Sequence, residues 1–152
     1  KWIGQTTWRA AGDFAPVLIR KGALNNENDL ILSPDHRLFI YQRGDTIGAG
    51  RPEVLVKARH LVNGHGITRL RGGYIEYFQL LLDRHQIIYA EGIAAESMLV
   101  DTRTRAVLPK AISQSFAARR TETDATIYPD CEVSQDLLKP DAATRLLRAS
   151  TM

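Results

Sequence analysis

Two strand–histidine–strand stretches decide the fold of this chain: DLILSPDHRLFI at residues 29–40 and YFQLLLDRHQIIYAEG at residues 77–92. In each stretch an apolar run leads into a histidine and a second apolar run leads out of it. Runs rich in Ile, Leu, Phe and Tyr favour half-buried β-strands. The sequence therefore predicts that His36 and His85 stand on a rigid β scaffold, where an imidazole can donate or accept a proton.

Short strands separated by turn residues fill the rest of the first ninety residues. Apolar runs at residues 15–20 and 86–90 predict strands. Residues 54–62 predict a strand followed by a helical turn that stops at residues 63–64, Asn-Gly. The Asn-Asn pair at residues 25–26 tolerates a left-handed backbone. Many short strands at this spacing predict a mostly β domain.

The strand pattern fades after Gly92, and residues 103–152 are richer in Ala, Arg, Thr and Gln. Two segments there predict short helices, residues 109–120, which begin with a proline, and residues 139–148. We therefore expect a β domain over residues 1–100 and a partly helical C-terminal extension over residues 101–152.

Length and composition restrict the class of protein. The 152 residues suffice for one domain with a substantial core, and a hydrophobic content of 44% is ordinary for a globular protein. The net charge of +3 comes from scattered basic residues, unlike the concentrated basic face of a dedicated nucleic-acid binder. No apolar run reaches the length of a transmembrane helix. We expect no nucleic-acid partner and no membrane span.

Metal and cofactor chemistry find little support in the sequence. The single cysteine, Cys131, excludes an internal disulfide and a cysteine-based zinc site. His60 and His65 lie five residues apart across a glycine turn, without a third ligand nearby. That spacing favours a surface loop over a metal site, so we expect neither a metal nor a cofactor.

The first block brings a hydroxyl and an imidazole together. Pro34 fixes its own φ and pushes Ser33 into an extended conformation, so that the following residues turn. This geometry points Ser33 and His36 into the same small space, where they can hold a peptide group and protonate its departing nitrogen. A structural interpretation also fits, in which the serine caps the turn and the histidine fills its interior.

The second block adds a histidine with a carboxylate close by in sequence. Asp83 precedes His85 by two residues, so on a strand the two side chains share a face. Asp83 can then orient the imidazole of His85. The alternative is a solvent-facing Asp83 beside a half-buried His85. Glu91 and Gly92 end the strand, where Gly92 permits a left-handed backbone.

Taken together, the blocks resemble Hint domains, the self-processing modules of hedgehog proteins and inteins. Ser33-Pro34-Asp35-His36 is similar to the Thr-x-x-His block of that family, with serine in place of threonine. Residues 82–92 are similar to its later histidine block, and residues 54–64 and 94–99 to bacterial Hint-type domains at the ends of large, often exported proteins. The resemblance covers about residues 1–100 and implies a Hint-type β horseshoe of short strands.

The family reaction implies roles for the matching residues. A Cys or Ser at the first position of a Hint domain attacks the preceding carbonyl and converts a peptide into a thioester or an ester. The resemblance implies that Ser33 and His36 destabilise this peptide and protonate its leaving nitrogen. It implies that His85, with Asp83 beside it, assists acyl transfer or resolution. No His-Asn pair follows Gly92, so we expect cleavage at the N-terminal junction and not two-sided splicing.

The resemblance also implies a partner. Residues 1–4, KWIG, are unlike the opening of a Hint domain. We therefore expect the nucleophile to lie upstream and these 152 residues to be catalytically silent by themselves. The expected partner is the chain's own upstream polypeptide, and the resemblance suggests a secreted or cell-surface parent protein.

Two other functions fit the sequence. The first is a hydrolase that uses Ser97 and His85 with either Asp83 or Glu96, although the chain has no Gly-x-Ser-x-Gly motif. The second is a non-catalytic β interaction module of a large, exported bacterial protein, which binds a protein or a glycan and in which both histidines are structural.

Overall fold

The computed structural model of the chain describes residues 2–82, 85–97, 110–111, 114, 133, 137–138 and 140–151. Within these residues the fold is mostly β, as the sequence predicts. Nine strands form antiparallel sheets of two, three and four strands. The strands are β1 (Trp2–Arg9), β2 (Val17–Ile19), β3 (Leu30–Leu32), β4 (Arg37–Tyr41), β5 (Glu53–Lys57), β6 (Ile67–Arg69), β7 (Tyr74–Leu81), β8 (Ile87–Ala90) and β9 (Ile93–Glu96).

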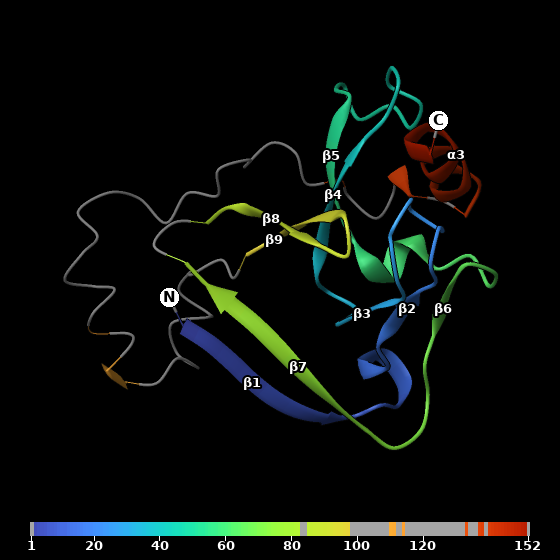
Figure 1. Cartoon of the computed structure of the whole chain (residues 1–152). Helices are drawn as coiled ribbons and strands as arrows, with labels where there is room; N and C mark the ends of the chain where they lie inside the picture. The colour runs from blue at the N-terminus through green and yellow to red at the C-terminus, as the bar shows by residue number, and fades with distance from the viewer. Residues whose placement is uncertain are drawn as a thin grey trace.

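The three sheets bring distant parts of the sequence together. Strand β1 pairs with β7 in a long two-stranded ribbon, the three-stranded sheet has the order β3-β2-β6, and the four-stranded sheet has the order β5-β4-β9-β8. Figure 1 shows the β1–β7 ribbon running past the hairpin of β8 and β9. Strands β3 and β4, which flank the first histidine block, therefore belong to different sheets.

Several local predictions are confirmed. The runs on either side of the first block form β3 and β4, and β5 passes directly into the short 3-10 helix η2 (Ala58–Leu61). A second 3-10 helix, η1 (Gly12–Phe14), follows β1. Asn25 adopts a φ of 60° in the connection from β2 to β3, which is the left-handed conformation expected there. Each of these features depends on a few neighbouring residues, which a sequence pattern can show.

Strands β6 and β9 were not expected from the sequence, and β9 matters most for the site. The pattern suggested that the β region fades after Gly92, yet β9 lies in the interior of the four-stranded sheet between β4 and β8. Its sequence is IAAE, and alanine is depleted in strands. Ala95 is buried in the core, where a small side chain fits between neighbouring strands. Packing thus overrides the weak local preference of this segment.

The C-terminal helix shares the core of the β sheets. Helix α3 (Pro140–Thr151) confirms the helix expected near residues 139–148, with Pro140 at its start. Leu146 and Leu147 of α3 are buried in one cluster with side chains of β2, β4 and β5. Figure 1 shows α3 beside β4 and β5. The other predicted helix, residues 109–120, lies almost entirely outside the described residues. The boundary near residue 100 stays a prediction.

No helix in the described part of the chain has the length and apolar character needed to cross a membrane.

Candidate functional site

A cleft of about 300 Å³ opens where the three sheets meet. Strand β3 and the turn after it line one side, β7 lines another, and the β8–β9 hairpin completes it. Ile31, Phe78 and Leu80 contribute apolar walls. Ser33, His36 and Glu96 contribute polar groups. The cleft therefore places hydrogen-bonding groups beside an apolar surface, an arrangement typical of binding sites for small molecules and peptides.

The turn of the first block is held rigidly by main-chain hydrogen bonds. The His36 N–H donates to the Ser33 carbonyl oxygen at 3.1 Å, which closes the turn. Helix η2 then fixes the turn from outside: the Ala58 N–H donates to the His36 carbonyl and the Arg59 N–H to the Pro34 carbonyl, both at 2.9 Å. The structure thus brings Ser33 and His36 to one cleft, as their spacing suggested.

The ring of His36 has a defined hydrogen-bonding state. Its Nε2 lies 3.1 Å from the main-chain oxygen of Glu96. A carbonyl oxygen only accepts, so Nε2 carries the proton. Burial lowers the pKa of His36, and the nearby charge of Glu96 and the hydrogen bond to its carbonyl oppose this only in part. His36 is therefore neutral at pH 7, and Nδ1 is the unprotonated, basic nitrogen of its ring.

Glu96 carries a carboxylate with three donors. The Nε of Arg37 donates to Oε1 at 2.7 Å and its second guanidinium nitrogen donates to Oε2 at 2.6 Å, in the two-point geometry that arginine favours. The Nε2 of His85 also contacts Oε2, at 2.9 Å. Burial by itself would raise the pKa of Glu96, but the hydrogen bonds from His85 and Arg37 and the charge of Arg37 outweigh it and lower the pKa. Glu96 is therefore ionised at neutral pH.

His85 is buried and is held by Glu96, which lines the cleft. The residue is only 3% exposed, and Nε2 donates to the Glu96 carboxylate, which is only an acceptor. The buried Nδ1 has no hydrogen-bond partner among the residues that the structure describes. Asp83, which the sequence suggested as the orienting carboxylate, lies outside those residues. In the described structure Glu96 contacts His85 as such a carboxylate would.

The β8–β9 hairpin explains why Glu96 reaches both sides of the site. Glu91 and Gly92 form its two-residue turn with φ angles of 51° and 83°, as a type I′ turn requires. The resulting register pairs Glu96 with Ile87, two residues after His85. On the other edge of β9, Leu38 pairs with Ala95, which brings Arg37 alongside Glu96.

The register of the β8–β9 hairpin could have indicated from the sequence that Glu96 lies near His85. Two strand-like runs separated by Glu91-Gly92 predict a hairpin, and counting outward from its turn pairs residue 96 with residue 87. The sequence pattern instead suggested Glu96 only as the acid of a hydrolase. Ser97, the nucleophile of that alternative, is buried, and its Oγ accepts a hydrogen bond from the Gln86 N–H at 2.9 Å. Ser97 therefore supports the hairpin and presents no accessible hydroxyl.

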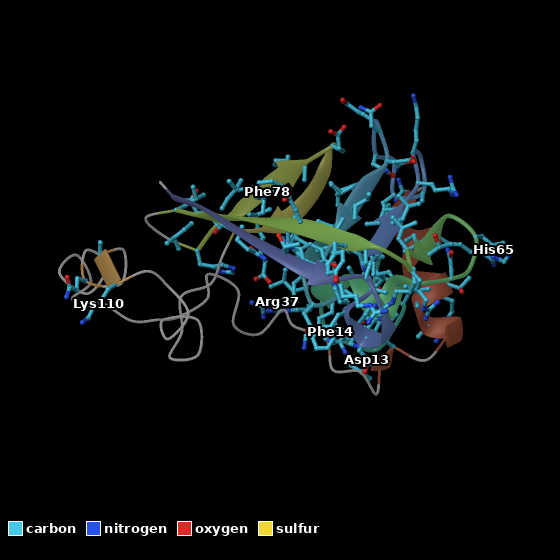
Figure 2. All side chains as sticks on the ribbon, turned by 90° about the horizontal axis from the view of Figure 1, so that it is seen from below. Asp13, Phe14, Arg37, His65, Phe78 and Lys110 are labelled. Atoms are coloured by element: carbon cyan, nitrogen blue, oxygen red, sulfur yellow. The ribbon has the colours of Figure 1, made fainter. Side chains whose placement is uncertain are left out.

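The remaining histidines do not contribute to the cleft. His65 lies on an exposed turn where its Nδ1 is 3.0 Å from the Asn63 carbonyl oxygen, and Figure 2 shows it at the edge of the molecule, away from Arg37 and Phe78. The described residues contain no group of three His, Cys, Asp or Glu side chains that could hold a metal ion. Ser33, His36 and His85 therefore remain the candidate catalytic residues among those that the structure describes.

A family model described as "Hint domain" matches residues 1–102 of the chain. No curated protein and no solved structure matches it.

Proposed function

This chain belongs to the Hint domain family, and from that membership we propose that it is a self-processing domain that cleaves the peptide bond at its own N-terminal junction. The substrate is the chain's upstream polypeptide, and the nucleophile is a Cys or Ser at the junction. The observation that carries the proposal is the cleft that both Ser33 and a neutral His36 line.

The proposed step is an acyl shift from nitrogen to sulfur or oxygen. The thiol or hydroxyl attacks the carbonyl carbon of the preceding residue, so that a C–S or C–O bond forms and the C–N bond breaks. The proton lost by the nucleophile ends on the new amine, and the step needs no oxidant or reductant. A second nucleophile, such as an added thiol, then takes the acyl group and completes the cleavage.

His36 is the proton carrier in this proposal. Because it is neutral at pH 7, it can take the proton of the nucleophile and return it to the departing nitrogen. Ser33 orients the peptide by a hydrogen bond, and the apolar walls of the cleft limit access of water to the reacting groups. His85 is proposed to assist the later transfer of the acyl group. Asp83 stays a candidate partner for His85.

A cleavage assay on the chain joined to its upstream polypeptide tests the proposal. Purified protein is followed over time by gel and by intact mass, with and without an added thiol. We expect cleavage at the junction, and faster cleavage with thiol where the intermediate is a thioester. His36→Ala should slow it on the order of a hundredfold, the usual scale for general acid–base catalysis.

The matched control is His65→Ala, which removes an exposed histidine away from the cleft and should leave the rate unchanged. Full-rate cleavage by the His36→Ala protein would contradict the role of His36. Absence of cleavage in the parent protein would instead favour the non-catalytic β interaction module.

A further inference from the structure

Glu96 occupies a position that the family reaction does not by itself explain. Its main-chain oxygen accepts from His36 at 3.1 Å, and its carboxylate accepts from His85 at 2.9 Å. One residue therefore contacts both histidines through two different groups. Because both groups belong to one residue, the position of Glu96 on β9 affects the contacts of both rings.

The carboxylate of Glu96 is fixed by Arg37. The side chains of this pair are 11% and 12% exposed, and both carboxylate oxygens are engaged by the guanidinium. This pairing fixes the plane of the carboxylate and leaves Oε2 pointing at His85. Arg37 also offsets the negative charge, so Glu96 can hold His85 without leaving an unpaired charge in the interior.

We propose that Glu96 is the positioning residue of this site, setting the tautomer and orientation of both histidines. Its carbonyl holds His36 with the proton on Nε2, which leaves Nδ1 as the basic nitrogen. Its carboxylate holds His85 in the same tautomer. Any effect of Glu96 on the cleavage rate rests on the proposed function. The tautomers of His36 and His85 do not depend on it.

Nitrogen NMR of the histidine rings tests the structural part on the chain as it stands. Above neutral pH, long-range proton–nitrogen spectra of the parent protein should show the Nε2–H tautomer for both His36 and His85. A predominant Nδ1–H tautomer for either ring would overturn the proposal, and this measurement needs no variant to fold.

Glu96→Gln separates the two groups of this residue. The carbonyl remains, so His36 should keep its Nε2–H tautomer. Its titration midpoint should move to lower pH, because the carboxylate charge that raises its pKa is gone. His85 should lose its single tautomer, since the glutamine amide can present either oxygen or nitrogen to it. Glu27→Gln removes an exposed carboxylate from the loop before β3 and should change neither ring.

The cleavage assay gives the second readout. In the chain joined to its upstream polypeptide, Glu96→Gln should shift the acid limb of the rate–pH profile to lower pH, together with the titration midpoint of His36. Glu27→Gln should leave the profile unchanged. Unchanged spectra for His85 in Glu96→Gln would contradict the proposal whatever the cleavage rate. The expected ring spectra together with no cleavage in the parent protein would refute the proposed function and leave the positioning role standing.

Discussion

The two histidines of the site are held by different means. His36 sits in a turn closed by its own main chain and braced by η2, and its ring contacts a main-chain oxygen. His85 depends on a side chain, because its Nε2 contact is the carboxylate of Glu96. The geometry of His36 is therefore built into the backbone, whereas that of His85 can be lost by a single substitution at Glu96 on β9, the strand paired with β8.

The largest effect is expected from breaking the ion pair that supports His85. Arg37→Met leaves the Glu96 carboxylate buried without its cation, which should lower the free energy of unfolding by about 3–5 kcal/mol. Chemical denaturation measures it. Arg59→Met is the matched control, because the ion pair between Arg59 and Asp35 is 33% and 61% exposed and its loss should cost less than about 1 kcal/mol. Equal losses in the two variants would contradict the assignment of Arg37–Glu96 as the buried pair.

A smaller effect is expected from straining the turn that places Glu96. Gly92 has a φ of 83°, and an added Cβ would meet only Glu27 Cγ at 3.9 Å, an ordinary contact. Gly92→Ala should therefore cost only backbone strain, about 1–2 kcal/mol of unfolding free energy. Amide exchange should rise in β8 and β9 and stay unchanged in the turn at His36. Faster exchange at both places would show that the two histidines do not have separate supports.

Ser33→Ala tests the contribution of the Ser33 hydroxyl, which belongs to the turn at His36. In the cleavage assay it should slow the reaction by no more than about tenfold, because a hydroxyl that orients the peptide contributes about 0.5–1.5 kcal/mol. The loss should be smaller than that of His36→Ala, which removes the proton carrier itself. A greater loss for Ser33→Ala would shift the main catalytic role from the ring to the hydroxyl.

The smallest expected effect is a dependence of stability on pH. His36 and Glu96 both have a lower pKa in the folded protein than their ordinary values of 6.5 and 4.5. In acid, the unfolded chain therefore binds more protons than the folded protein does. The contribution of these two groups to the free energy of unfolding is complete above pH 6.5. It should fall as the pH drops through the lowered pKa of His36, and again below pH 4.5 through that of Glu96. Denaturation curves at several pH values measure this, and His36→Ala should remove the first decrease. A rise in stability on acidification would contradict both shifts.

Local features of this chain could be predicted from the sequence because they depend on neighbouring residues. Pro34 restricts the residue before it and thereby sets the turn that ends at His36. The apolar runs beside that turn have the composition of strands and form β3 and β4. The left-handed Asn25 and the terminal helix α3 have equally local causes.

The tertiary structure decided which distant residues these local features contact. Strand β9 has little strand preference of its own and forms because it pairs with β4 and β8 on either side. That pairing places Glu96 next to Arg37, some sixty residues earlier in the chain, and next to His85. The cleft likewise depends on β7 lying close to β3. The local sequence is sufficient to predict the turn at His36 and the mostly β character, since both follow from short-range sterics and patterning. Only the pairing of β9 with the distant strand β4 decided which cation holds the Glu96 carboxylate, because the energy of such long-range contacts depends on the whole fold and not on any local window.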